Sequence, residues 1–292
     1  MILLVRVYTS HNKTLMTNYI LFDFETGGLD VVHTPPLQLT GRNGQDGSVL
    51  FNMYIRPHKG AVISEKAIEV NGITDQVLLD NNAIALSDAL EQVVRIVRKT
   101  FGRKSVVWVA YNTFGFDQLV LEYSFKRAGL RMPDCWRFMD LLPLCRDRFV
   151  VSNYRLSTVH AKLVTRAEGA EPFKLHDSLG DTLCLFELFH ACQDICGEDL
   201  FPRYTRPKMD SIHMYDMPLD TTLSGYDPAM KFNAFGYHTI GHVFQKFRDI
   251  GCDTELFVQF LMNDLKVFKD YRAKRITQQM RLINALFHSN AM

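Results

Sequence analysis

The chain has 292 residues, enough for one large domain or for a medium domain with an appendage. Hydrophobic residues make up 47% and charged residues 22%, as in an ordinary globular protein. The 33 basic and 32 acidic residues balance, which excludes a general basic coat, so any contact with nucleic acid must come from a local patch.

The cysteines and the short apolar segments predict where in the cell the protein is located. The six cysteines form no C-x-x-C pair and no zinc-type spacing with histidine, so we expect reduced thiols in an intracellular protein, cytoplasmic or nuclear. No segment approaches about 18 uninterrupted apolar residues, so we expect no membrane contact. Residues 1–16 are expected to be an N-terminal extension.

The first predicted elements are strands. A run of strand-forming residues over 19–25 breaks at Gly27 and Gly28. Two further strands, over 37–39 and 49–55, are separated by a turn rich in glycine and asparagine. These strands predict an antiparallel hairpin after the first strand, and therefore a sheet that is mixed at one edge.

Helices then alternate with strands. Residues 87–100 carry apolar side chains at helical spacing, and Gly102 follows as a stop signal. The continuous apolar run over 106–110 predicts a strand buried on both faces. The order predicts a layered α/β domain over 17–200. Its other expected elements are a helix starting at Ser64, a turn at 71–75, helices over 112–127, 155–163 and 177–193, and a short strand at 138–140.

The remaining residues, 201–292, are expected to form a loop-rich linker and a helical C-terminal region. Residues 201–235 contain four prolines and read as loop, whereas 236–288 read as two or three helices.

One part of this C-terminal region is basic. Between residues 266 and 281, six basic residues stand against one acid, with apolar residues interleaved at helical spacing. A helix with one face in solvent and an apolar stripe against the protein is slightly favoured. The alternative is a surface that binds the phosphates of a nucleic acid, and its affinity would then depend strongly on salt. The basic residues are Lys266, Lys269, Arg272, Lys274, Arg275 and Arg281.

The strand over 19–25 delivers two carboxylates, Asp23 and Glu25, just before the glycines. Strand side chains alternate, so both acids share one face. Neighbouring carboxylates raise each other's pKa unless a cation lies between them, and Mg²⁺ and Mn²⁺ prefer such oxygen ligands. By itself, however, the pair also fits a surface strand with two solvated acids.

Three further residues complete a set. Asp117 lies five residues after Asn112, behind the buried strand, and Asp181 lies five residues after His176. Hydrolysis of a phosphodiester needs an activated water and compensation for developing charge, which two divalent ions about 3.5–4 Å apart can supply. Four carboxylates roughly neutralise two such ions. A histidine, with an ordinary pKa of about 6.5, suits removal of a proton from the water.

In this order and context, the residues resemble those of the DEDDh exonucleases, the proofreading (DnaQ-like) branch of the ribonuclease H-like superfamily. The resemblance covers residues 19–195. It implies a ribonuclease H-like mixed sheet flanked by helices, with a helical C-terminal extension. It also implies that Asp23, Glu25, Asp117 and Asp181 bind two Mg²⁺ or Mn²⁺ ions and that His176 is the general base.

The resemblance further implies 3′ to 5′ hydrolysis of single-stranded or frayed DNA with release of nucleoside monophosphates. Amides near Thr26 and Gly27 would meet the terminal sugar, and Leu29 and Ile73 would flank the terminal base. Apolar contact with a base tolerates any sequence. Asn112 is a further candidate for substrate binding, and Phe114 and Phe116 are candidates for a second stacking surface, with core packing favoured for Phe116.

Three alternatives stay open at this point. A 3′–5′ exoribonuclease that trims RNA ends fits the same residues, because selection at the 2′-hydroxyl depends on pocket shape. A catalytically silent nucleic-acid-binding module could share the fold, although all five catalytic positions are filled. The C-terminal helices could also dock the chain on a polymerase or on another replication or repair partner.

Overall fold

The computed structural model describes residues 17–30, 32, 34–166, 173–209, 216, 219, 226–266 and 269–288. The expected extension over residues 1–16 lies outside them. In this part of the chain no helix is long and apolar enough to cross a membrane.

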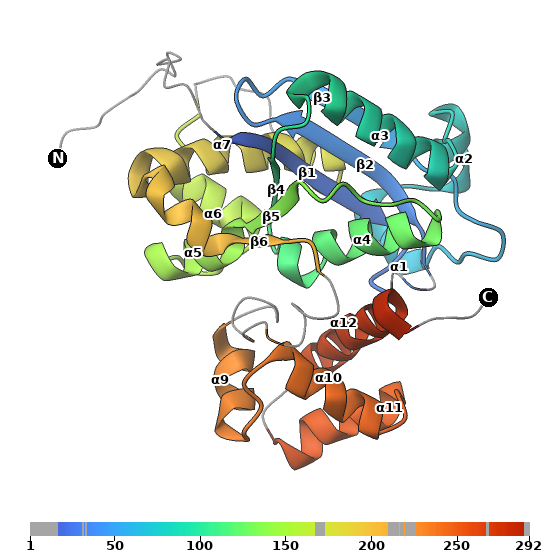
Figure 1. Cartoon of the computed structure of the whole chain (residues 1–292), viewed down its shortest axis with the longest axis vertical. Coiled ribbons are helices and arrows are strands. Elements are labelled where there is room, and N and C mark those ends of the chain that lie inside the picture. The colour runs from blue at the N-terminus through green and yellow to red at the C-terminus, as the bar shows by residue number, and fades with distance from the viewer. Residues whose placement is uncertain are drawn as a thin grey trace.

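A six-stranded mixed sheet forms the centre of the fold (Figure 1), with strand order β3-β2-β1-β4-β5-β6. β1, β4 and β5 are parallel, while β2, β3 and β6 pair antiparallel with their neighbours. The predicted hairpin and mixed α/β sheet are therefore confirmed. The strands are β1 (Asn18–Thr26), β2 (Pro36–Asn43), β3 (Val49–Tyr54), β4 (Val106–Ala110), β5 (Trp136–Asp140) and β6 (Thr205–Pro207).

Large aromatic side chains fill the core beside the central strands. Phe22 of β1 meets Trp108 of β4 edge to face, with ring centroids 5.2 Å apart, and Trp136 lies 4.5 Å from Trp108 on the next strand. All five residues of β4 are buried, as the continuous apolar run predicts. This packing fixes β1, the strand that carries the first two acids.

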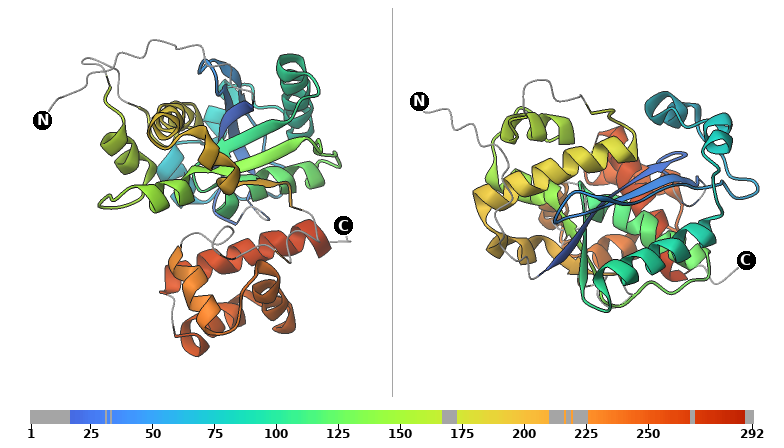
Figure 2. Two further views of the ribbon diagram at one scale, coloured as in Figure 1. Left: turned by 60° about the vertical axis from the view of Figure 1, so that its left-hand side comes forward. Right: turned by 90° about the horizontal axis from the view of Figure 1, so that it is seen from above.

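Helices cover both faces of the sheet (Figure 2). α7 packs on β1 and β2, whereas α3 and α4 lie on the other side. The expected Ser64 cap is present, because its hydroxyl accepts the N–H of Ala67 at 3.1 Å. The helices of this part are α1 (Glu65–Asn71), α2 (Asp75–Asp80), α3 (Leu86–Phe101), the 3₁₀ turn η1 (Thr113–Gly115), α4 (Asp117–Arg127), α5 (Leu141–Arg148), α6 (Leu156–Leu163) and α7 (Ser178–Cys196).

Residues 201–235 differ from the expectation of a loop. The 3₁₀ helix η2 (Glu198–Tyr204) extends into this stretch, β6 adds a strand to the sheet, and α9 (Tyr226–Ala234) follows. β6 pairs antiparallel with β5, with Arg206 opposite Phe138. A strand this short that ends at a proline has too little pattern to be recognised. The sheet thus takes its last strand from beyond residue 200.

The C-terminal helices confirm the expectation for residues 236–288. α10 (Ile240–Asp249), α11 (Thr254–Gln259), a π-helical turn η4 (Phe260–Asp264) and α12 (Asp270–His288) surround a small aromatic core. In that core, Phe247 and Phe257 pack with ring centroids 5.1 Å apart. Figure 1 shows α12 between the other C-terminal helices and the α/β part, where it packs on α4.

Candidate active site

Three of the predicted acids meet beside the end of β1. The strand buries Phe22 and Phe24 and directs Asp23 and Glu25 away from that core. Asp181 lies in the first turn of α7, which packs on β1. Carboxylate oxygens of Asp23, Glu25 and Asp181 all lie within 4.8 Å of one another. The structure therefore brings these residues together from two elements far apart in sequence.

The fourth acid, Asp117, joins them from the opposite side of the sheet. It is the first residue of α4 and is only 4% exposed. Its Oδ1 accepts the backbone N–H of Phe24 at 3.4 Å, which ties the start of α4 to β1 between the two strand acids. Its charge also acts on Asp23. All four acids thus share one site.

The acids are crowded, which shifts their proton affinities. Burial, followed by the charges of Asp117 and Glu25, raises the pKa of Asp23 well above its usual range. Burial and the charge of Asp181 raise the pKa of Glu25 to about 7. Burial raises the pKa of Asp181 to about 6, against the lowering effect of the His176 N–H. A cation bound between these carboxylates would offset their mutual repulsion.

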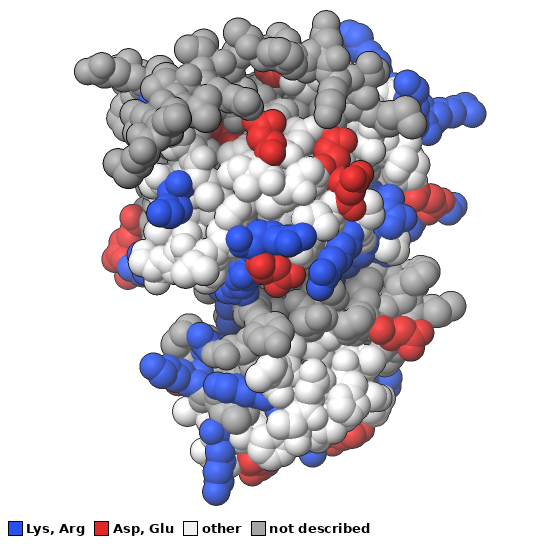
Figure 3. Space-filling model, turned by 90° about the vertical axis from the view of Figure 1, so that its left-hand side faces the viewer, with Lys and Arg blue, Asp and Glu red and all other residues white. Residues whose placement is uncertain are grey.

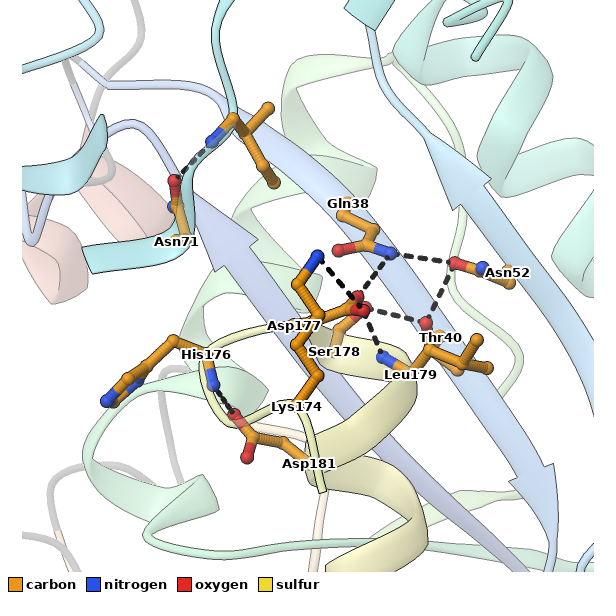
Figure 4. Close-up of polar contacts among 11 residues, drawn as sticks. Gln38, Thr40, Asn52, Asn71, Lys174, His176, Asp177, Ser178, Leu179 and Asp181 are labelled. Atoms are coloured by element: carbon orange, nitrogen blue, oxygen red, sulfur yellow. Dashed lines mark hydrogen bonds and ion pairs between the residues drawn. The ribbon is translucent and has the colours of Figure 1, made fainter. Parts of the chain in front are cut away.

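His176 lies beside this cluster on the loop that leads into α7. Its side chain is exposed and its backbone is left-handed, with φ of 60°. The N–H of His176 donates to Asp181 Oδ2 at 3.1 Å, and the imidazole points away from that carboxylate (Figure 4). The histidine is thus close to Asp181 and able to reorient, because solvent surrounds its ring.

Gly180 allows this loop to close tightly. A Cβ on this residue would lie 2.1 Å from the carbonyl oxygen of Lys174, far inside any van der Waals contact. The loop that carries His176 therefore rests directly on the first turn of α7, four residues from the histidine.

Asp177, which the sequence analysis missed, fixes the start of α7. Its Oδ1 caps the helix by accepting a hydrogen bond from the N–H of Leu179 at 3.4 Å. The same oxygen accepts a hydrogen bond from Nε2 of Gln38 on β2 at 3.1 Å. Next to it, the hydroxyls of Thr40 and Ser178 lie 2.6 Å apart (Figure 4). This polar network holds α7 so that Asp181 faces β1. An aspartate directly before the predicted apolar helix was the available signal, because aspartate is a common N-cap residue.

A second missed residue, Asp140, organises the segment before Asp117. It ends β5, is 2% exposed, and accepts backbone N–H groups of Asn112 at 2.8 Å, Phe114 at 3.1 Å and Leu142 at 2.9 Å. Burial raises its pKa, although these hydrogen bonds oppose the shift. Its position at the end of a predicted strand was the only signal.

Arg206 of β6 holds the same segment from the other side. Its Nε donates to Gln118 Oε1 at 2.7 Å, and its Nη2 donates to the carbonyl of Phe114 at 3.3 Å. The guanidinium carbon also lies 3.9 Å from the centroid of the Phe114 ring. No sequence signal identifies this arginine, because its strand was not expected.

Two predicted substrate contacts are corrected by these surroundings. Phe114 is 4% exposed with Arg206 over its face, so its ring is not available to stack on a base. Ile73 is 3% exposed in a small core with Leu37 and Leu78, so it cannot flank a base. Both side chains are apolar residues beside the site, and burial could not be distinguished from base contact in the sequence.

The other predicted contacts remain near the acids. Leu29 is 64% exposed, and Asn112 is half-buried with a left-handed φ of 67°. Thr26 and Gly27 form a closed turn, because the Thr26 hydroxyl donates to the Gly28 carbonyl at 2.6 Å and the Gly27 N–H donates to the Pro35 carbonyl at 2.8 Å. The Gly27 amide is thus occupied within the protein, which corrects its predicted role as a donor to the terminal sugar. Phe116 packs partly buried against the core, as favoured.

The fold and the four acids define a class of protein. A mixed sheet of this order with such a cluster beside its central strand is the arrangement of the DEDD-type 3′–5′ exonucleases in the ribonuclease H-like superfamily. The model of the family described as Exonuclease matches residues 20–189, more than half of the chain. The chain therefore belongs to this exonuclease family.

Curated relatives agree with this assignment. A DNA polymerase III PolC-type protein from Bacillus cereus is 29% identical over 157 residues, which cover 53% of this chain and 10% of the relative. A protein of the same description from Thermotoga petrophila is 26% identical over 176 residues, covering 59% of this chain and 11% of the relative. The chain thus spans about a tenth of the length of these relatives.

Solved structures share the fold. A zinc-bound complex of E. coli exonuclease I with single-stranded DNA has a TM-score of 0.52 at 17% identity, covering 64% of this chain and 42% of the other. A complex of E. coli exonuclease I with a 5cy-dA13 oligonucleotide has a TM-score of 0.50 at 17% identity, with the same coverage of each chain.

Proposed function

We propose that this chain is a metal-dependent 3′–5′ exonuclease that acts on single-stranded or frayed DNA and releases nucleoside monophosphates. The observation that carries the proposal is the clustering of Asp23, Glu25 and Asp181, with Asp117 beside them. The family membership and the single-stranded DNA in the complex of E. coli exonuclease I support it.

The four acids fit hard divalent cations. Their donors are all carboxylate oxygens, the kind of ligand that Mg²⁺ and Mn²⁺ prefer. Burial first, and then the charges of neighbouring acids, raise the pKa values of Asp23 and Glu25, and a cation would offset both effects. Asp23, Glu25, Asp117 and Asp181 would hold two such ions. Bound there, the ions would lower the pKa of water and stabilise charge that develops on the phosphoryl oxygens.

The protein's own groups supply the remaining functions. An imidazole nitrogen of His176, after rotation of its exposed side chain towards the acids, accepts the proton of the attacking water. Leu29 packs against the terminal base from the exposed turn after β1. Asn112 presents its amide to the substrate from the segment before Asp117, while Asp140 and Arg206 keep that segment in place.

A second proposal concerns the kind of nucleic acid that is cleaved and the protein partner of the chain. An exoribonuclease would use the same acids, and a catalytically silent binding module would keep the fold without cleavage. The DNA polymerase III PolC-type relatives favour DNA, and they also suggest a polymerase or replication partner for the C-terminal helices. Co-purification of the full chain from its source tests that partner.

The direct test uses matched single-stranded DNA and RNA labelled at the 5′ end, with Mg²⁺, Mn²⁺ or EDTA. We expect metal-dependent ladders that shorten from the 3′ end, faster for DNA than for RNA, and their loss in His176→Ala. Faster shortening of RNA would favour the exoribonuclease. Binding of either strand without cleavage would contradict the enzymatic proposal and favour the silent module.

A further inference from the structure

The C-terminal helix α12 is bonded to both loops of the candidate active site. Gln279 donates its Nε2 hydrogen to the carbonyl of Gly115 at 2.7 Å, two residues before Asp117. Arg281 pairs with Asp30 at 2.5 Å between Nη1 and Oδ2, on the turn that follows Glu25. The loop after β1 and the loop before α4 are thus both held by one helix from the far end of the chain.

α12 also runs along α4, which fixes its direction across the site. Lys126, near the end of α4, donates to the carbonyls of Ala285 and Leu286 near the end of α12. Arg275 lies one helical turn before Gln279, and residues four apart share a helix face. The side chain of Arg275 therefore emerges on the same side of α12 as the contact with Gly115.

Arg275 faces charges of the active site. Its side chain is exposed to solvent, yet the surrounding protein removes enough water to lower the pKa of its guanidinium. The charge of Arg146 on α5 lowers this pKa further, whereas Asp117 and Asp140 raise it. Gln279, one turn further along the same helix face, is bonded to Gly115 just before Asp117, so the geometry and these charge effects agree that Arg275 lies near the acids.

Neither arginine has an acidic partner within ion-pair distance among the residues that the structure describes. Arg146 lies with its guanidinium carbon 5.8 Å from the ring centroid of Tyr154, and Arg275 makes no ion pair. By contrast, Lys274 pairs with Asp270 at 2.9 Å and Arg281 pairs with Asp30. Lys274 and Arg281 are thus held in ion pairs, whereas Arg275, on the face of α12 that contacts Gly115, is not.

Two guanidinium groups held near each other repel, and an anion between them offsets that cost. Lys and Arg side chains gather at the level where the α/β part meets the C-terminal helices (Figure 3). We propose that Arg275, on the face of α12 that contacts Gly115, binds a backbone phosphate of the single strand as the strand enters the acid cluster, with Arg146 of α5 adding positive charge nearby. This inference rests on the proposed function, and it makes the C-terminal helices part of the substrate path.

The test compares Arg275→Ala with Arg98→Ala in the full chain. Arg98 is an exposed arginine near the end of α3, which leads into the start of β4, so it lies at the end of the sheet away from the acids. A fluorescent oligo-dT strand is titrated by anisotropy in Mg²⁺ over a range of salt, with His176→Ala in every protein to prevent cleavage. Arg275→Gln, which keeps the side-chain stem, is measured in parallel, and all melting temperatures are compared.

We expect Arg275→Ala and Arg275→Gln to weaken binding about tenfold and Arg98→Ala to leave it unchanged. The slope of log K against log salt should become shallower by about 0.7 for the loss of one phosphate contact on a single strand. With His176 restored, KM for the strand should rise more than kcat falls.

Equal affinity and equal salt slope for the Arg275 and Arg98 variants would overturn the inference while leaving the nuclease proposal intact. The wild-type protein is also assayed on the p-nitrophenyl ester of thymidine 5′-monophosphate, which has no neighbouring backbone phosphate. If the wild type cleaves neither this ester nor the strand, the proposed function fails. If it also does not bind the strand, this inference fails with it.

Discussion

The carboxylate of Asp140 accepts the backbone N–H of Asn112 at 2.8 Å, and through this bond a buried residue at the end of β5 shapes the segment that leads to Asp117. The same carboxylate also holds the N–H groups of Phe114 and Leu142. The position of Asp117, a proposed metal ligand, therefore depends on the buried carboxylate of Asp140.

Replacing Asp140 by asparagine tests this dependence. Asparagine replaces one acceptor oxygen with an NH₂ donor, so at least one of the three N–H groups loses its partner. We expect a loss of about 1–3 kcal/mol in the free energy of unfolding and a fall of about tenfold or more in kcat/KM. Urea unfolding and initial rates measure both. Asp88→Asn, at an exposed position on α3, should change neither by much, and an Asp140→Asn protein of wild-type rate would show that the segment is held without this residue.

The loop before α7 allows a second test through Gly180. Alanine is normally favoured over glycine inside a helix by about 1 kcal/mol, but here its Cβ would meet the Lys174 carbonyl oxygen at 2.1 Å. We expect Gly180→Ala to displace the loop, to cost about 1–3 kcal/mol of stability, and to lower kcat more than tenfold by moving His176. Gly60→Ala meets no neighbour within 4 Å but strains a left-handed backbone with φ of 82°, so it should also cost stability while leaving kcat unchanged, and it is the control for activity. If Gly180→Ala keeps the kcat of the wild type, catalysis does not depend on the position of this loop and the prediction is wrong.

Removal of metal gives a third prediction, at Asp181. Burial raises the pKa of Asp181 to about 6, and the charge of Asp181 raises the pKa of Asp23 and Glu25, so removing this carboxylate relieves repulsion in metal-free protein. Asp181→Ala should therefore melt at the same or a higher temperature than the wild type in EDTA, yet lose activity. Mg²⁺ should raise the melting temperature of the wild type by mass action and raise that of the variant much less. A large loss of stability in EDTA would mean that Asp181 is a structural residue.

A fourth prediction concerns pH and the buried residue Glu122, away from the acid cluster. Burial raises its pKa from 4.5 to about 7, although Oε1 accepts hydrogen bonds from Gln118 and Met209. Between these two values the folded protein binds more protons than the unfolded chain, so this group's contribution to stability falls as pH rises and is lost above the folded pKa.

Glu122→Gln should therefore match the wild type near pH 4.5 and exceed it by about 1–3 kcal/mol at pH 8. The difference between the two proteins in urea unfolding at each pH isolates this residue from the other acids. If that difference is the same at both pH values, Glu122 titrates with an ordinary pKa and the prediction fails.

Local patterns were sufficient to predict much of this fold and part of the site. The alternation of β1 placed Asp23 and Glu25 on one side, and the turn after β2 predicted the hairpin. The helices expected over 112–127 and 177–193 placed Asp117 and Asp181 near helix starts. Each of these features depends on a few consecutive residues, and the sequence contains them all. The roles of the five catalytic candidates stay predictions that the assays above test.

The remaining features depend on contacts between distant segments. β6 is three residues long, and Arg206 acquires its role only because that strand lies beside Gln118 and Phe114. The burial of Phe114 and Ile73 likewise comes from tertiary packing. The periodicity of apolar residues in the sequence does not distinguish a side chain buried in the core from an exposed one that contacts a base. The position of α12 across the site depends on Gln279 and Arg281, whose partners lie more than 160 residues away.

The most direct test of the central claim follows a single strand of DNA labelled at its 3′-terminal nucleotide, cleaved in Mg²⁺ by the wild type and by Asp23→Asn prepared in parallel. The account predicts that the first labelled product of the wild type is a nucleoside monophosphate and that the rate falls at least a thousandfold in the variant, because Asp23 lies among the other three acids. A labelled oligonucleotide as the first product, or equal rates for the two proteins, would contradict it.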